Sequence, residues 1–194
     1  RVKTGIPGRF SVYNSLAAIS VVSKLGVDAE TIKEALLNVR VPGRSELVDN
    51  KKGLTIMIDY AHSPESLQSI LSAVKSYTRG KVISVFGCGG DRDKTKRPIM
   101  GKISTSIADF TIITSDNPRT EDPDTIVNEI EVGAKKAKGK YKKIVNRTEA
   151  IKYAINMASK NDIIVLAGKG HETYQEINGI KHHYDEREII KEVI

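Results

Sequence analysis

The chain lacks several features that mark whole classes of protein. Its 194 residues contain one cysteine, Cys88, and no tryptophan. A single cysteine excludes an internal disulfide and suits a reducing compartment. No apolar run approaches the roughly 18 residues that a membrane-spanning helix needs, and the first residues do not resemble a signal peptide. We therefore expect a cytoplasmic protein that makes no membrane contact.

Phosphate-binding motifs are missing as well. The sequence has no G-x-x-x-x-G-K-[ST] loop. Its two glycine-rich stretches, residues 87–91 and 168–172, both lack the G-x-G-x-x-G spacing of a dinucleotide-binding turn. If the protein uses ATP, the loop that cradles the phosphates lies outside these residues. The chain begins at Arg1 rather than at a methionine, from which we expect a piece of a longer protein.

Positive charge is the main compositional bias, with a net charge of +7 and a pI near 9.4. The densest basic stretch, residues 135–143, holds a single aromatic residue, Tyr141. Such a stretch is more typical of a solvated loop than of a nucleic-acid interface, which stays as the alternative. We expect no nucleic-acid partner. A general positive field favours anionic small substrates.

Apolar periodicity divides the chain into two unequal parts. Residues 11–25 and 29–39 have helical patterns, and Asp28 suits the N-cap of the second helix. Two helices cannot form a core alone, and the Pro42-Gly43 turn predicts a boundary between a domain over 1–42 and another over 43–194. Beyond the turn we expect strands at 46–49, 54–59, 81–86, 110–114, 142–146, 162–167, 173–177 and 180–184, and helices from about 64 and at 98–108, 123–136, 147–159 and 185–194. This alternation predicts an α/β fold with a mostly parallel, Rossmann-like sheet and helices on both faces.

Charged and amide side chains follow the expected strands where each strand ends. The strands ending near residues 59, 86, 113 and 167 are followed by DYAH, GCGGDRDK, SDNPR and AGKGHE. In an open parallel sheet, ligands bind beyond the carboxyl ends of the strands. Arginines, acids and an amide at that edge suit a ligand that carries both a carboxylate and an ammonium. Solvated loops are the alternative interpretation.

These motifs, read in order, resemble one family. The order is GRFSVYNSLAAI, VPGR, DYAHSPESL, FGCGGDRDKTKRPIMG, TSDNPRTEDP and GKGHETYQ. It is closely similar to the Mur ligases of peptidoglycan synthesis, and among them to the diaminopimelate-adding members, over nearly the whole chain. Residues 1–42 resemble the end of the central ATP-binding domain, and residues 43–194 resemble the C-terminal domain. The family's UDP-binding domain, phosphate loop and carbamylated lysine have no counterpart here.

The resemblance implies an ATP-dependent amide ligase of cell-wall precursor synthesis, with a role in cell shape and cell division. ATP and Mg²⁺ would convert a carboxylate of UDP-MurNAc-L-Ala-D-Glu into an acyl phosphate, which the amine of meso-diaminopimelate attacks. The chain would supply the diaminopimelate site and part of the nucleotide site, but no catalytic residue and no metal ligand. The resemblance implies a monomer whose magnesium ligands lie mostly in the missing domain.

Residues 116–119 match the DNPR recognition loop of the diaminopimelate-adding members. Diaminopimelate is lysine with an extra carboxylate, and the Arg119 guanidinium can pair with that carboxylate bidentately. Lysine-adding relatives generally lack this arginine. By the matching motifs, the expected diaminopimelate contacts are Arg92, Asp116, Asn117, Pro118, Arg119, Gly168 and Glu172. Glu172 would accept from the distal ammonium and Arg92 would take a carboxylate. On the residues alone, Glu172 fits an acid at a helix N-terminus equally well.

The resemblance also implies nucleotide-facing residues outside the phosphate loop. They are Asn14, Arg44, Asp59 and His62. Asn14 is expected to meet the adenine, and Arg44 and Asp59 are expected to lie near the ribose and phosphates. Without the motif context, Asp59 and His62 fit a strand-end turn.

Four residues of the glycine-rich loop region have open roles. Lys94, Lys96 and Arg97 either neutralise phosphate or substrate charge or are solvated. Cys88 is most simply a small buried residue in a tight turn.

A hypothesis from another functional class also fits the sequence. The chain can be a free-standing module that binds an amino acid, or one subunit of a two-chain Mur-ligase-like complex. Residues encoded upstream of Arg1 discriminate between these hypotheses. A phosphate-binding loop there supports the ligase, and a start codon just before Arg1 supports the module.

Overall fold

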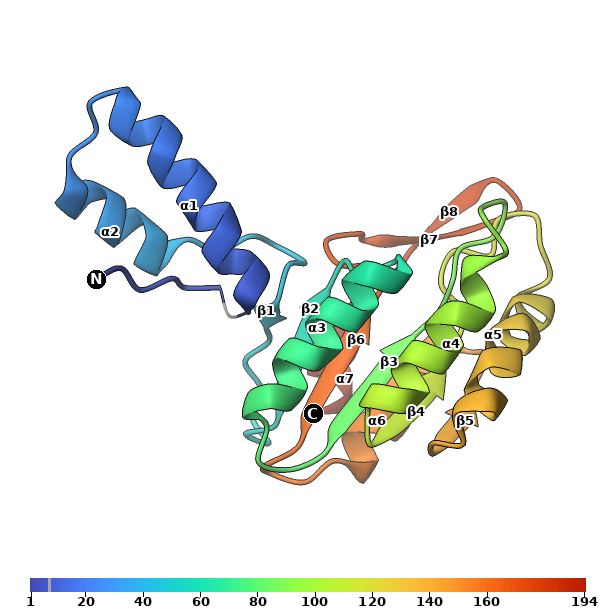
Figure 1. Ribbon diagram of the computed structural model, residues 1–194. Coiled ribbons are helices and arrows are strands. Elements are labelled where there is room, and N and C mark those ends of the chain that lie inside the picture. Colours follow the sequence, from blue (N-terminus) through green and yellow to red (C-terminus); the bar gives the residue numbers. More distant parts are fainter. Residues whose placement is uncertain (7) are drawn as a thin grey trace.

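The structure, a computed structural model, describes residues 1–6 and 8–194 (Figure 1). The helices are α1 (Arg9–Lys24), α2 (Ala29–Asn38), α3 (Pro64–Tyr77), α4 (Lys96–Ile107), α5 (Pro123–Ala137), α6 (Arg147–Met157) and α7 (Glu186–Val193). The strands are β1 (Glu46–Leu47), β2 (Thr55–Asp59), β3 (Val82–Phe86), β4 (Phe110–Ile113), β5 (Tyr141–Lys143), β6 (Ile163–Ala167), β7 (Tyr174–Ile177) and β8 (Ile180–His183). Each helix and strand expected from the sequence is present.

Six of these strands form one sheet in the order β1-β2-β6-β3-β4-β5. All neighbours pair in parallel except β1, which pairs antiparallel with β2 at one edge. Ala167 pairs with both Asp59 and Phe86, and Phe86 also pairs with Ile113. Four neighbouring strands therefore end at one level. The predicted Rossmann-like sheet is confirmed.

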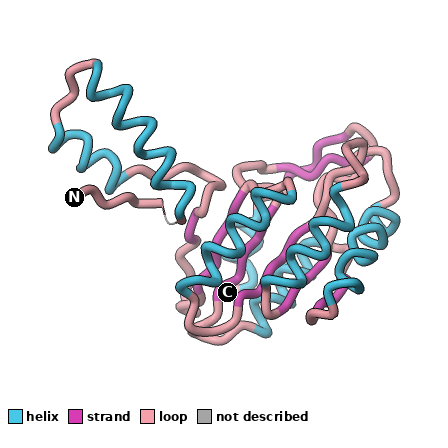
Figure 2. Tube along the Cα trace, viewed as in Figure 1, coloured by secondary structure: helices cyan, strands magenta, loops and turns pink. Residues whose placement is uncertain are grey.

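Helices cover both faces of this sheet (Figure 2). The cluster under α3, α4 and α5 includes Leu67, Leu71, Met100 and Ile130, and the cluster under α6 and α7 includes Ile151, Ile155, Ile189 and Ile190. In β2, Met57 belongs to the first cluster, whereas Ile56 and Ile58 belong to the second. This alternation is that of a strand buried on both faces.

The α1–α2 pair lies to one side of the sheet (Figure 1). Asp28 caps α2, as predicted, because its carboxylate accepts from the backbone N–H groups of Glu30 and Thr31, both at 3.0 Å. Leu16 and Val21 of α1 are exposed. The pair therefore has little core of its own. In the described part of the chain, no helix has the length and apolar character to span a membrane.

Several boundaries differ from the sequence-based expectation by one to three residues. Helix α4 begins at Lys96 rather than at residue 98, because proline is tolerated in the first helical turn, where its missing N–H has no partner to lose. Strand β5 lies at residues 141–143 rather than 142–146. The backbone still runs beside β4 beyond it, since Ser115 N donates to Val145 O at 3.0 Å.

The basic stretch at residues 135–143 is only partly a loop. It covers the end of α5 and the whole of β5. Lys135 and Lys143 both pair with Glu131, at 3.1 and 3.0 Å, so part of its charge is balanced within the domain.

A buried arginine joins the ends of two strands. The Arg147 side chain is fully buried, and its Nε donates to Glu186 Oε1 at 2.8 Å. Its Nη2 donates to Ala167 O at 3.0 Å and its Nη1 to Ser115 O at 3.3 Å. These carbonyls lie at the end of β6 and just after β4, the two strands that flank β3. Arg147 therefore sets the spacing of the strand ends, and Glu186 balances its charge.

Replacing Arg147 with methionine leaves Glu186 as a buried charge without its partner. We expect Arg147→Met to lower the free energy of unfolding by about 3–5 kcal/mol in urea denaturation. The control is Lys152→Met on the same helix, which removes an exposed pair with Glu149 and should cost less than about 1 kcal/mol. Equal unfolding midpoints for Arg147→Met and the unmodified chain would contradict this role of Arg147.

Candidate functional site

The loops that follow β2, β6, β3 and β4 meet at the carboxyl ends of the strands, as the sequence predicts. They enclose a cavity of about 310 Å³, called here the strand-end cavity. It is lined by Tyr60, His62, Gly87, Cys88, Gly89, Arg92, Asp93, Lys96, Asp116, Asn117, Arg119, Gly168 and Glu172. The structure thus brings together all of the expected diaminopimelate contacts except Pro118. That residue lines a neighbouring surface pocket, and its carbonyl accepts from Glu121 N at 3.0 Å.

The β7–β8 hairpin holds the 116–119 loop in place. Its hydrogen bonds to the loop are Gln175 Nε2 to Asp116 O at 2.7 Å, Glu176 N to Asn117 Oδ1 at 3.0 Å, Arg119 N to Glu176 O at 3.0 Å, and Asn178 N to Arg119 O at 2.7 Å. Arg119 has a φ of 52°, a left-handed conformation that costs a non-glycine residue on the order of 1 kcal/mol or more. The hairpin hydrogen bonds on both sides of Arg119 stabilise this conformation.

The Arg119 guanidinium is also held by fixed partners. Its Nη1 donates to Gly90 O at 2.8 Å, and its Nε lies 3.3 Å from Glu176 Oε2. Among the described residues, none accepts a hydrogen bond from Nη2. The side chain is 19% exposed and lines the strand-end cavity. An oriented guanidinium with free N–H groups is suited to bind a carboxylate.

Two glycines allow the strand-end loops to approach one another. A β-carbon at Gly90 would overlap the Pro118 carbonyl. Gly168 has a φ of 119°, and a β-carbon there would lie 2.5 Å from Asp116 Oδ2. Any side chain at these positions would push the 116–119 loop away from the other strand ends.

A buried lysine that the sequence did not single out lies next to this loop. The Lys169 side chain is fully buried, with Nζ 3.0 Å from Asn117 Oδ1 and 3.3 Å from Glu172 Oε2. Asn117 Nδ2 donates to the same Glu172 oxygen at 2.8 Å. A lysine between two glycines after a buried strand was the available signal, but it equally fits an exposed turn.

Glu172 lies in the segment between β6 and β7, so its interpretation as a helix N-terminal acid is wrong.

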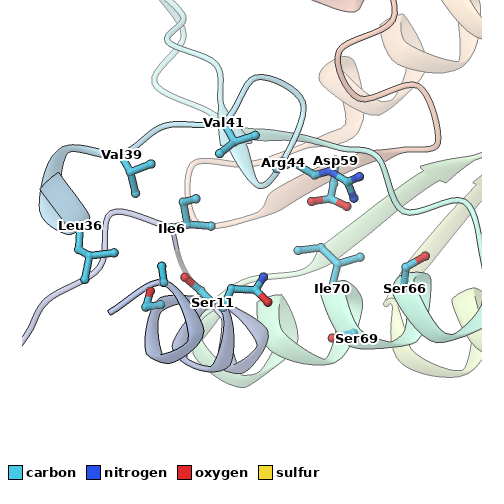
Figure 3. Close-up of a pocket in the computed structure, with 13 residues that line it drawn as sticks. Ile6, Ser11, Leu36, Val39, Val41, Arg44, Asp59, Ser66, Ser69 and Ile70 are labelled. Atoms are coloured by element: carbon cyan, nitrogen blue, oxygen red, sulfur yellow. The ribbon is translucent and has the colours of Figure 1, made fainter. Parts of the chain in front are cut away.

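A second cavity, of about 630 Å³, lies between the α1–α2 pair and the β2–α3 region (Figure 3). We call it the helix-pair cavity. Its lining includes Ile6, Ser11, Asn14, Leu36, Val39, Val41, Arg44, Asp59, Ser66, Ser69 and Ile70. Three of the expected nucleotide-facing residues, Asn14, Arg44 and Asp59, are thus in one cavity. His62 is not with them: it lines the strand-end cavity, and its Nδ1 lies 2.8 Å from Tyr60 O.

Asp59 has two roles in this region. Its carboxylate accepts from Ala61 N at 2.9 Å, which is the bond of a strand-end turn, and from Ser45 N at 2.8 Å, in the segment just before β1. The same side chain lines the helix-pair cavity. Burial raises the pKa of Asp59 despite these hydrogen bonds.

The basic residues after the glycine-rich loop have three different surroundings. Arg97 is fully buried and donates to both Glu121 oxygens at 3.0 and 2.9 Å, so its interpretations as a solvated or a substrate-neutralising residue are wrong. The Arg97 guanidinium lowers the pKa of Glu121 to about 2. Lys94 pairs with the same carboxylate at 3.0 Å. Only Lys96 lines the strand-end cavity, where it donates to His62 O at 2.8 Å.

The comparison with known families identifies the fold. A sequence model described as "Mur ligase, glutamate ligase domain" matches residues 43–170. The chain belongs to the Mur ligase family. A solved structure titled as that of a UDP-N-acetylmuramoyl-L-alanyl-D-glutamate–2,6-diaminopimelate ligase matches all of this chain and 40% of its own, with 37% identity and a TM-score of 0.76. The structure of the UDP-N-acetylmuramate-alanine ligase of Thermotoga maritima shares the fold, at 23% identity and a TM-score of 0.68 over 87% of this chain and 36% of that one.

Curated relatives of this Mur ligase chain are longer than the chain itself. The UDP-N-acetylmuramoyl-L-alanyl-D-glutamate–2,6-diaminopimelate ligase of Caldanaerobacter subterraneus subsp. tengcongensis is 52% identical over 189 residues, which are 97% of this chain and 39% of the relative. The protein of the same name from Clostridioides difficile is 48% identical over 190 residues, with the same coverage. The chain therefore spans about 39% of the length of these relatives.

No metal-binding cluster is present in the described part of this Mur ligase chain. Across residues 1–6 and 8–194, no group of three or more His, Cys, Asp or Glu side chains is arranged to hold a metal ion. His183, one of two adjacent histidines, pairs with Glu188 at 2.6 Å, and this carboxylate raises the pKa of His183.

Cys88 of this Mur ligase chain lines the strand-end cavity but is almost fully buried, as expected from the sequence. Burial raises the pKa of its thiol to about 12. Because the thiolate is the reactive species, we expect no reaction of the folded chain with a chromogenic disulfide reagent at pH 8, and complete reaction in guanidinium chloride. Rapid labelling of the folded chain would contradict the closed packing around Cys88.

Proposed function

We propose that this chain is the amino-acid-binding part of an ATP-dependent ligase that adds meso-diaminopimelate to UDP-MurNAc-L-Ala-D-Glu. The curated relatives of that name support this assignment, together with the composition of the strand-end cavity. Residues 43–194 are proposed as the amino-acid-binding domain, and residues 1–42 as the end of an ATP-binding domain. The proposed enzyme acts on small molecules in peptidoglycan precursor synthesis.

The observation that carries the proposal is the placement of opposite charges in one small cavity. Arg119 and Arg92 supply guanidinium groups, while Glu172 and Asp116 supply carboxylates. Diaminopimelate carries a carboxylate and an ammonium at each end, so it can satisfy both kinds of group. We propose that Arg119 binds the distal carboxylate and that Glu172 accepts from the distal ammonium.

The same arrangement is proposed to discriminate against lysine. Lysine lacks the distal carboxylate and would leave the Arg119 guanidinium without a ligand partner. A site built to bind a charged group rejects a ligand that lacks the group, because its own polar atoms then stay unpaired. Arg119 is therefore proposed as the main determinant of amino-acid choice.

The helix-pair cavity is proposed to receive the nucleoside end of ATP. All three remaining nucleotide candidates line this cavity, and we propose that Asn14 lies near the base and that Arg44 and Asp59 lie near the sugar and phosphates. The Asp59 carboxylate also accepts from two backbone N–H groups. ATP supplies the activation of the peptide carboxylate as an acyl phosphate. The described residues include no group of three or more His, Cys, Asp or Glu side chains that could hold a metal ion, and the sequence has no phosphate-binding loop. We therefore propose that the loop that cradles the phosphates and most of the magnesium ligands lie outside this chain.

The direct test of the amino-acid assignment is Arg119→Ala. Losing a charge-assisted bidentate contact should weaken binding of meso-diaminopimelate by ~2–4 kcal/mol, measured by calorimetry on this chain. In the complete ligase the change should appear largely as a raised KM, because the distal end changes little in the transition state. Arg119→Lys should restore binding only in part, because an ammonium cannot reproduce the planar fork.

The matched control is Arg79→Ala. Arg79 is exposed and lies between α3 and β3, at the end of the sheet opposite to the cavity, so the variant has the same net charge. It should bind meso-diaminopimelate as the unmodified chain does. Binding of L-lysine as tight as that of meso-diaminopimelate, or unchanged affinity in Arg119→Ala, would refute the assignment.

A further inference from the structure

Lys169 is a fully buried cation next to the strand-end cavity, and it does not line the cavity itself. An ammonium buried in a protein needs hydrogen-bond partners and a balancing charge. Here the partners are Asn117 Oδ1 at 3.0 Å and Glu172 Oε2 at 3.3 Å. Both partners do line the cavity. Lys169 is therefore positioned to act on a ligand through these two residues.

The contact with Asn117 sets the orientation of its side-chain amide. The Oδ1 atom accepts from Lys169 Nζ and from Glu176 N, both at 3.0 Å, so its two lone pairs are used. The amide nitrogen donates one proton to Glu172 Oε2 at 2.8 Å. One Nδ2 proton is left over, so Asn117 can meet a ligand only as a donor.

The contact with Glu172 selects which of its oxygens is available. Oε2 accepts from both Lys169 Nζ and Asn117 Nδ2, which leaves Oε1 without a hydrogen bond to any described residue. Two donors on one oxygen also fix the plane of the carboxylate. Glu172 therefore presents a single acceptor to the cavity.

We propose that Lys169 is a positioning residue that sets the donor and acceptor pattern of the amino-acid site. Its ammonium makes Asn117 a donor, which suits a ligand carboxylate, and makes Glu172 Oε1 the acceptor, which suits a ligand ammonium. This inference rests on the proposed function, because it concerns the same cavity and an amino-acid ligand. Lys169 itself touches neither the ligand nor the reacting atoms.

The test is Lys169→Met, which keeps an aliphatic side chain of similar length and removes the ammonium. The whole 194-residue chain is titrated with meso-diaminopimelate to millimolar concentrations by ¹⁵N NMR. We expect the dissociation constant to rise roughly 30-fold or more, since truncating a buried charged partner leaves the other partners misplaced. The Asn117 side-chain amide signals should also shift in the variant without ligand.

A matched control separates positioning from stability. Ile155→Ala removes a buried side chain on α6, in the cluster on the α6–α7 face of the sheet, and lowers stability without touching either cavity. It should keep the affinity for meso-diaminopimelate and the Asn117 amide signals. If Lys169→Met does not fold, Lys169→Gln replaces it, because a glutamine keeps an N–H donor for Asn117 Oδ1, and a smaller rise is then expected.

The outcomes are distinguishable. A dissociation constant within about threefold of that of the unmodified chain, or tighter binding by Lys169→Met, would overturn the positioning role. An equal loss of affinity in Ile155→Ala would overturn it too, because the effect would then follow stability. If the unmodified chain does not bind meso-diaminopimelate at all, the proposed function fails and this inference fails with it.

Discussion

The Arg147–Glu186 pair is the interaction on which the rest of the site depends. One guanidinium contacts a carbonyl at the end of β6, a carbonyl just after β4, and a carboxylate of α7. Burial of such a charge is costly unless all its donors find acceptors, so the three partners must stay where they are. Because β6 and β4 flank β3, this constraint also defines the space into which the glycine-rich loop after β3 fits. The cavity at the strand ends is a consequence of that spacing.

The β7–β8 hairpin fixes the conformation of the 116–119 loop. Its two strands lie outside the main sheet and form hydrogen bonds with the 116–119 loop. These bonds stabilise the left-handed backbone of Arg119, and the Glu176 carboxylate orients its guanidinium. Binding groups that are already oriented lose less entropy when a ligand arrives. The hairpin thus supports the proposed amino-acid site although it contributes no residue to the lining of the strand-end cavity.

Most of the fold was predictable from the sequence, because alternating strand and helix periodicity and the Asp28 cap are local signals. The convergence of four strand ends also followed from the general behaviour of parallel sheets. Burial of charged residues was not predictable. Arg97 and Lys169 look like exposed loop residues in the sequence, and their partners Glu121 and Asn117 are 24 and 52 positions away. The sequence also did not predict that His62 lines a different cavity from the other proposed nucleotide-binding residues, because this depends on the direction of the turn after β2.

The most direct test of the account is a crystal structure of this chain with meso-diaminopimelate. The account predicts the ligand in the strand-end cavity, with one carboxylate on the Arg119 guanidinium and the ammonium of that end on Glu172. The Arg147 contacts and the hairpin bonds to the 116–119 loop should be unchanged. A ligand bound in the helix-pair cavity, or bound at the strand ends without contact to Arg119, would contradict the account.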